Sequence, residues 1–428
     1  MRLKTLLVLL LCLMLSSCTV LRLFEEVKPQ AGDWLQLGGN PQHTGYTSQE
    51  IIPPLKIHWE YAATAAIPTA SPTVVGGKLF IHCRNGDVAV LNPADAKEIA
   101  QGGVSYSMEG APVADGKYLF AFDAFARQPL ITYDLSQGYI TGEKRSGVGF
   151  EASPLVVGEG MKRRIYAANL QGELVCIDRY GAPQFLFKTE ERLEAVKVKP
   201  ASAPVASTQI HSSPALLGRT VIFGNDAGVL YGVDSETGKQ TFRISLGNES
   251  IYAAVCMDTA EQAAFITTAD VGRSRSTGGA VIKVSLKDIA NPIIEKRIPL
   301  PATLFGAAAL SPEGFVLAGA SDHKLRCFNK RTMELVWAFE SKASFNAAPL
   351  IAGKYVFAGS LDRRLYVLEL ATGKLVQRLK LSGRIKTPPI AVGNRIIVCA
   401  ENNMVYSLTH DPAPDTTKES LDDDDAEF

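Results

Sequence analysis

Short apolar runs between small polar turns fill the chain from Ser71 to Leu408. Residues 350–379 show the pattern clearly, with apolar runs at 350–351, 355–358, 365–370 and 375–379. Runs of this length between Gly and Asp turns predict antiparallel strands joined as a meander. Because the runs are almost continuously apolar, they predict strands that are buried on both faces.

The same block recurs eight times with a period of about forty residues. Most copies start with a proline after Ser, Ala or Pro, and two degenerate copies start near Ala254 and Ala309. The prolines are Pro72, Pro112, Pro154, Pro214, Pro349 and Pro389. Four short strands per repeat of this size are typical of a β-propeller. The sequence therefore predicts an all-β fold, an eight-bladed propeller.

The eighth copy stops after its third strand, at Leu408. An alternating segment with no repeat of its own, residues 55–61, precedes the first copy. Pairing this N-terminal strand with the last blade would close the ring and remove an open sheet edge. We therefore expect residues 55–410 to form the propeller, with residues 55–61 completing the eighth blade.

A recurring turn motif resembles that of the pyrroloquinoline-quinone-type (PQQ-like) propeller family. It consists of Asp or Asn, then Thr-Gly-Lys, then an aromatic residue. Its copies here are Asp234…Thr237-Gly238-Lys239…Phe242, Thr372-Gly373-Lys374, and Asn329…Trp337. Residues 33–46 also resemble the leader that precedes the first blade in extracytoplasmic members. The resemblance implies the propeller fold over most of residues 55–408.

The N-terminus has the pattern of a lipoprotein signal. Arg2 and Lys4 precede an apolar run too short to span a membrane, and Leu-Ser-Ser leads to Cys18. This matches the bacterial lipobox, so we expect residues 1–17 to be cleaved and Cys18 to carry acyl chains (palmitate). Thr19 follows where an inner-membrane retention signal would have Asp. An ordinary signal peptide with a chance Cys is the alternative.

The remaining segments and the overall charge complete this picture. Residues 18–54 are expected to be a lipidated linker, mainly 19–32, and the leader. Residues 411–428 form an acidic tail that cannot build a core, so we expect it to be disordered. The chain of 428 residues has a formal net charge of +0. The sequence shows no basic nucleic-acid footprint. It also has no further apolar run long enough to span a bilayer. We expect a monomeric propeller.

The cysteines point to free buried thiols rather than to a disulfide framework. Once Cys12 leaves with the signal and Cys18 is lipidated, five remain: Cys83, Cys176, Cys256, Cys327 and Cys399. They are an odd number without close pairs in sequence. A bond between Cys83 and Cys399, in adjacent blades, stays open.

Catalytic signals are weak. The six histidines have no metal-ligand spacing, and we find no metal site and no haem attachment motif. Quinoprotein dehydrogenases of the resembled family use adjacent cysteines, a Trp beneath the quinone, a calcium site and a catalytic Asp. This chain has no adjacent cysteines, and its tryptophans, Trp34, Trp59 and Trp337, lie before the blades or in an edge-strand motif. We therefore expect no cofactor and no enzyme activity.

The long loops predict a binding face. Insertions at 188–211, 269–279 and 123–129 leave the propeller on the same side, because both loop types they belong to emerge on one face. Arg127, Arg273 and Arg275 lie in these loops, and Arg is enriched at interface hot spots. They are the candidate partner-binding residues. Loops that merely tolerate insertion are the alternative.

Signal, lipobox and eight repeats resemble the non-catalytic BamB branch of the family. This implies a lipid-anchored scaffold on the periplasmic face of the outer membrane, with protein partners in a β-barrel assembly complex. Residues 206–211 do not match the loop that contacts the barrel subunit in that branch, so no partner-binding residues are carried over from it. The alternative function is a quinoprotein-like or small-ligand-binding propeller that uses its central channel.

Overall fold

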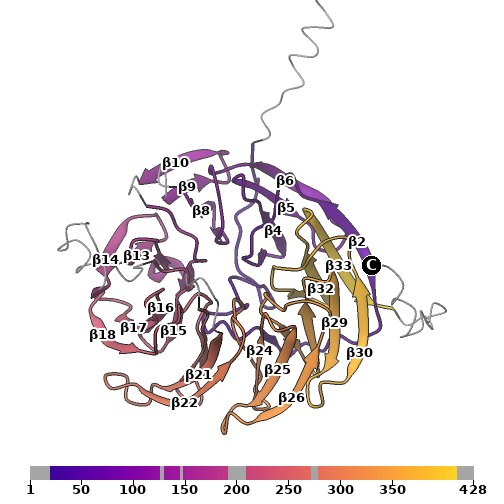
Figure 1. The fold of residues 1–428 in the computed structure, drawn as a ribbon. Helices are drawn as coiled ribbons and strands as arrows, with labels where there is room; N and C mark the ends of the chain where they lie inside the picture. The colour runs from indigo at the N-terminus through magenta and orange to yellow at the C-terminus, as the bar shows by residue number, and fades with distance from the viewer. Residues whose placement is uncertain (1–19, 126–129, 145–147, 191–208, 271–277, 412–428) are drawn as a thin grey trace, which may run out of the picture.

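The computed structural model describes residues 20–125, 130–144, 148–190, 209–270 and 278–411. Over these ranges the chain forms eight antiparallel sheets arranged as blades around a central axis (Figure 1). The predicted eight-bladed, all-β propeller is confirmed. Within these ranges a 3₁₀ turn, η1 (Gly160–Lys162), interrupts the third blade.

Each blade has four strands, numbered here from the axis outward. The inner strands are β3 (Thr73–Val75), β7 (Val113–Asp115), β11 (Leu155–Val157), β15 (Ala215–Leu217), β19 (Cys256–Asp258), β23 (Ala309–Leu310), β27 (Leu350–Ala352) and β31 (Ile390–Val392). The second strands are β4 (Lys78–His82), β8 (Tyr118–Phe122), β12 (Arg164–Ala168), β16 (Thr220–Gly224), β20 (Ala263–Thr267), β24 (Phe315–Gly319), β28 (Tyr355–Gly359) and β32 (Arg395–Cys399). The third strands are β5 (Asp87–Leu91), β9 (Leu130–Asp134), β13 (Glu173–Asp178), β17 (Val229–Asp234), β21 (Gly279–Ser285), β25 (Lys324–Asn329), β29 (Arg364–Glu369) and β33 (Met404–His410). The outer strands are β6 (Glu98–Gly103), β10 (Tyr139–Lys144), β14 (Pro183–Lys188), β18 (Gln240–Ser245), β22 (Ile293–Leu300), β26 (Leu335–Glu340), β30 (Leu375–Lys380) and β2 (Leu55–Ala62).

The two faces of the ring differ in the loops they carry. Connections from an outer strand to the next blade, and from a second to a third strand, emerge on what we call the upper face. Turns between inner and second strands, and between third and outer strands, emerge on the lower face. This follows from antiparallel pairing, which reverses the chain at every strand.

The motif that marks the repeat joins neighbouring blades. Asp234 Oδ1 accepts hydrogen bonds from the backbone N–H groups of Glu236 and Thr237 and so shapes the turn before Gly238. Gly238 has a φ of +70°, and a Cβ there would lie 2.6 Å from the Phe185 ring of the preceding blade. Glycine therefore serves both the turn and the close approach of the aromatic ring.

Blades six and seven repeat this arrangement. The Trp337 ring packs on Gly373, and its Nε1 donates a 2.8 Å hydrogen bond to Leu370 O. In all eight blades the register between the third and outer strands shifts at a β-bulge, which sets these side chains toward the next blade.

The N-terminal strand completes the last blade, as predicted. β2 pairs antiparallel with β33, from Leu55 opposite His410 to Ala62 opposite Met404. Its bulge between Ile57 and Trp59 matches the bulge of the other outer strands. Trp59 thereby takes the position of Trp337, and its Nε1 donates a 3.0 Å hydrogen bond to Pro93 O in the first blade. The last repeat is thus divided between the two ends of the chain.

The segment before β2 differs from the linker expected at residues 19–32. Its described part packs beneath the first two blades, where Leu21, Leu23 and Val27 are buried. Leu23 N donates to Leu135 O at 2.7 Å, and Val27 forms a β-bridge with Gly116. These apolar side chains alternate with exposed ones, so one side of the segment contacts the blades.

The leader then turns into the channel and follows the inside of the ring (Figure 1). Its backbone carbonyls accept hydrogen bonds from inner strands of five blades, and β1 (Tyr46–Thr47) pairs parallel with β27. The bonds are Val74 to Trp34, Leu216 to Pro41, Met257 to Gln42, Leu310 to Thr44 and Ile351 to Gly45. The Gln36 side chain adds a sixth blade by accepting a 2.9 Å bond from Val156 N. The leader thus occupies edge donors that face the axis and would otherwise lack a protein partner.

The five cysteines named above are buried free thiols, as predicted, and Cys83 and Cys399 form no disulfide. Within the described ranges, no helix has the length and apolar character needed to cross a membrane.

We expect deletion of residues 55–61 to cause aggregation or a large drop in Tm. The deletion removes the outer strand of the last blade and the Trp59 contact to the first blade, and it exposes the edge of β33. Replacing exposed His58 on the same strand with Ala is the control and should leave Tm unchanged. An unchanged Tm and a monomeric elution profile for the deletion would rule out the closing role of β2.

Candidate functional site

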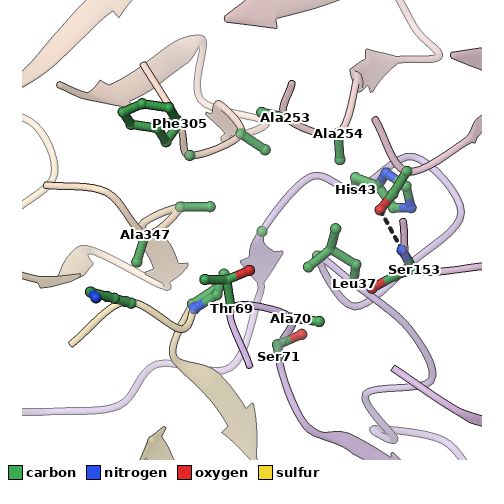
Figure 2. Close-up of a pocket in the computed structure, with 18 of the residues that line it drawn as sticks. Leu37, His43, Thr69, Ala70, Ser71, Ser153, Ala253, Ala254, Phe305 and Ala347 are labelled. Carbon is green, nitrogen blue, oxygen red and sulfur yellow. Dashed lines mark hydrogen bonds between the residues drawn. The ribbon is translucent and has the colours of Figure 1, made fainter. Parts of the chain in front are cut away.

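A cavity of about 630 Å³ lies on the axis above the leader. Trp34, Leu37, Gly38, His43 and Gly45 of the leader line its floor. Its walls are mainly the segments that lead from the upper face into the inner strands of all eight blades. Figure 2 shows part of this lining, with Ser71, Ser153 and Ala347 among the labelled residues. Because both ends of the leader leave on the lower face, the cavity opens toward the upper face.

The walls consist largely of small residues because eight blades converge there. Gly306 illustrates the crowding, since a Cβ at this position would lie 2.8 Å from the Ala347 backbone. Serines of the repeat starts bond one blade to the next. Ser213 Oγ accepts from Ser153 N at 2.9 Å, and Ser153 Oγ accepts from Ala111 N at 3.2 Å. The repeated Ser-Pro pattern therefore reflects contacts between blades around the axis.

Several polar atoms that line the cavity are shielded from solvent and lack a hydrogen-bond partner. Among the described residues these include Trp34 Nε1, Ser71 Oγ and Asn346 Oδ1. His43 is also buried, and desolvation lowers its pKa to about 4, so the imidazole is neutral at pH 7. The floor can therefore offer neutral donors and acceptors to a small polar molecule or to water.

An aromatic and ionic cluster forms one side of the mouth. His211 lies between Glu151 at 3.3 Å and Asp226 at 3.2 Å, and its ring stacks on Tyr252 with centroids 4.5 Å apart. Desolvation alone would lower the pKa of His211, but hydrogen bonds and charge from the two carboxylates outweigh it and raise the pKa to about 9. The imidazole is therefore charged at neutral pH and bridges the third and fourth blades.

The other charges of the mouth are also paired. Arg84 lies 3.2 Å from Glu109 and joins the first blade to the second. Burial raises the pKa of Glu109, and the Arg84 charge partly offsets this. Lys386 pairs with Glu401 in the eighth blade. These contacts stabilise the mouth of the ring, and none of them places a nucleophile beside a base.

The predicted site residues fall outside the described residues. This holds for Cys18 and for Arg127, Arg273 and Arg275. The described residues that flank the three arginines, such as Phe125 and Asp270, follow second strands. The loops that carry these arginines therefore start on the upper face, where the cavity opens.

The sequence analysis missed a pair of exposed aromatic residues on this face. Tyr106 and Phe125 are 61% and 66% exposed. Buried Asp123 holds both loops, accepting hydrogen bonds from Tyr106 N at 2.8 Å and from Phe125 N at 2.7 Å. In the sequence, each of these residues is visible as an aromatic residue in a polar loop. Only the fold shows that the two loops lie side by side.

One part of the case against a quinone site needs correction. We expected no tryptophan in the channel, because Trp34 precedes the blades in sequence. The leader folds into the channel and places Trp34 on the cavity floor. The chain has no adjacent cysteines. Among the described residues we find no group of His, Cys, Asp and Glu side chains that could hold a metal ion.

Solved structures share the fold at low sequence identity. BamB from Moraxella catarrhalis is 16% identical with a TM-score of 0.62, over 85% of this chain and 99% of its own. Quinohemoprotein alcohol dehydrogenase from Comamonas testosteroni is 12% identical with a TM-score of 0.68, over 90% and 82%. A europium-containing methanol dehydrogenase is 12% identical with a TM-score of 0.66, over 89% and 98%. At such identities the likeness shows the fold alone.

Sequence comparison distinguishes between these relatives. No curated protein sequence matches the chain. The family described as outer membrane protein assembly factor BamB matches residues 56–241 and 321–413, which together exceed half of the chain. With its eight PQQ-like repeats, this chain belongs to the BamB family.

Proposed function

We propose that this protein is a lipid-anchored, non-enzymatic scaffold on the periplasmic face of the outer membrane. It binds protein partners through its upper face and acts in the assembly of β-barrel outer-membrane proteins. The family to which the chain belongs supports this assignment. Cys18 of the lipobox supplies the anchor in this proposal, and Arg127, Arg273 and Arg275 take part in partner binding.

The observation that carries the proposal is the combination of long loops and a fixed pair of exposed aromatic residues on the upper face. The leader fills the lower end of the channel, whereas the upper face has the long loops and the exposed pair Tyr106 and Phe125. Aromatic residues and arginines on a rigid frame are the residue types that dominate protein–protein interfaces. Asp123 fixes both aromatic loops, so little conformational entropy is lost when a partner binds.

The chemistry of the cavity favours a scaffold over an enzyme. Its charged groups are paired with one another across blades, as Arg84 is with Glu109 and His211 with Glu151. A general base needs a pKa near the working pH and a free path to substrate. The pKa of His211 is about 9, and carboxylates contact both of its ring nitrogens. It is therefore suited to holding two blades together.

Changes on the upper face should weaken partner capture without lowering stability. We expect Tyr106→Ser with Phe125→Ser to reduce capture of outer-membrane assembly components by at least roughly thirtyfold, since a single hot-spot side chain contributes about 2 kcal/mol or more. Arg127→Ala, Arg273→Ala and Arg275→Ala together should act in the same direction. The measurement is crosslinked co-purification from membranes, with Tm recorded for each variant.

Lys239→Ala with Lys374→Ala is the matched control for this experiment. Both lysines are exposed in turns of the lower face. They should leave capture unchanged. Equal losses from the two faces, or no loss from either, would refute partner binding through the upper face.

A second candidate function is binding of a small ligand in the cavity. The unpartnered Trp34 Nε1 and Ser71 Oγ favour it, because shielded polar atoms cost free energy unless a ligand or water satisfies them. Adding pyrroloquinoline quinone with Ca²⁺ and recording absorbance and Tm distinguishes the two functions. The scaffold account expects no change in either quantity. A stoichiometric bound spectrum that is lost in Trp34→Phe would favour the ligand.

A further inference from the structure

The lower face has an exposed apolar patch beside the point where the described chain begins. We call it the anchor-side patch and define it by Val20, Phe24, Tyr139, Met161 and Tyr180. Phe24 is 90% exposed, Met161 69% and Tyr180 54%. Single exposed apolar residues are common, but five in neighbouring turns of one face call for an explanation.

Contacts show that the segment before the leader joins this patch. A Cβ on Gly138 would overlap Val20, so this segment lies directly against the turn that precedes Tyr139. Arg22 Nε donates a 2.8 Å hydrogen bond to Ser136 O in the same turn. Its guanidinium lies 5.4 Å from the centre of the Phe24 ring.

The patch continues from the second blade to the third. Tyr118 lies between them, with its ring centre 6.4 Å from that of Tyr180. The Tyr180 hydroxyl donates to Met161 Sδ at 3.3 Å. Met161 belongs to η1 and Tyr180 to the turn between β13 and β14, so both lie on the lower face.

Basic residues surround the apolar side chains. Arg22 and Lys162 are exposed, and Arg179 lies 5.6 Å from the Tyr180 ring centre. Within the described ranges, no carboxylate forms an ion pair with any of these three residues. Of the acidic residues nearby, Glu25 pairs with Lys78 at 3.7 Å and Glu26 with Lys28 at 3.6 Å. Exposed Glu159 lies in the same turn as Lys162. The patch therefore combines aromatic side chains with three basic residues that form no ion pair with any described carboxylate, and carboxylates lie at its edge.

We propose that the anchor-side patch rests on the phospholipid surface. The inference relies on the proposed lipid anchor at Cys18. Val20 is two positions after Cys18, which is at most about 7 Å of extended chain, so the acylated residue would hold this face against the bilayer. Tyr and exposed apolar side chains suit the interface, and Arg and Lys suit the anionic headgroups.

This geometry orients the whole ring. The lower face contacts the membrane, and the cavity and the aromatic pair Tyr106 and Phe125 face away from it. Acyl chains alone would leave the propeller free to rotate on its anchor. A second membrane contact, here the anchor-side patch, would fix its orientation.

Site-specific quenching in vesicles tests the contact with the full lipidated chain. A fluorophore is attached at Phe24→Cys, Tyr180→Cys or, on the opposite face, Tyr106→Cys. The five native cysteines described above are buried and should not react. The vesicles contain phosphatidylethanolamine and phosphatidylglycerol, with or without brominated acyl chains.

We expect brominated lipid to quench the labels at positions 24 and 180 several-fold more than the label at position 106. Omitting phosphatidylglycerol should reduce this difference, because the basic residues then lose their anionic partners. Equal, weak quenching at all three positions in a chain whose Cys18 is acylated would overturn the membrane contact and leave the patch as a surface for protein.

The mass of the N-terminal peptide tests the lipid anchor at Cys18 independently of the membrane contact of the anchor-side patch. An acylated peptide that starts at Cys18 supports the anchor. A chain without acylation that still shows quenching at position 24 would overturn the anchor while supporting the membrane contact of the patch.

Discussion

Closure of the ring by β2 is the constraint on which the rest of the structure depends. A meander of repeats has two ends, and the last blade would lack its outer strand if the chain simply stopped at His410. β2 supplies this strand across almost the whole length of the chain, and Trp59 provides the contact that bonds the eighth blade to the first. β2 closes the ring but comes early in the sequence. The residues before Leu55 must therefore pack against the ring without disturbing the pairing of β2 with β33.

The leader satisfies this requirement by becoming part of the ring. It enters beneath the second blade, follows the axis along inner strands of six blades, and leaves on the lower face before β2. The edges of the innermost strands carry backbone donors that point at the axis, and the leader accepts from them. Two consequences follow for function. The leader lies at the lower end of the channel, so the cavity opens toward the upper face, and the described chain begins, at Val20, on the face opposite that cavity.

Local pattern was enough to predict the blades, because strand length, turn residues and the forty-residue period are properties of neighbouring residues. It also identified residues 55–61 as the closing strand, but not Trp59 as the counterpart of Trp337, since the bulge that aligns them is visible only in the paired register. The position of Trp34 could not be predicted from its neighbours. It depends on unpaired donors of strands far away in sequence, and this is why the channel was expected to lack a tryptophan. The pair Tyr106 and Phe125 also needed the fold, because Asp123 brings together the connection that leads into the second blade and the loop after that blade's second strand.

Hydrogen exchange of the inner-strand amides, read by mass spectrometry on the full chain, tests most directly the claim that the leader is part of the ring. Backbone amides exchange slowly only where they are hydrogen-bonded and opening costs free energy. If the leader is an integral part of the ring, the inner-strand amides of Val74, Leu216 and Ile351, which donate to it, should exchange as slowly as amides of the second strands. Replacing residues 34–47 with a Gly-Ser sequence should speed their exchange while the second strands stay protected. Unprotected inner-strand amides in the native chain, or no change after the replacement, would contradict the account.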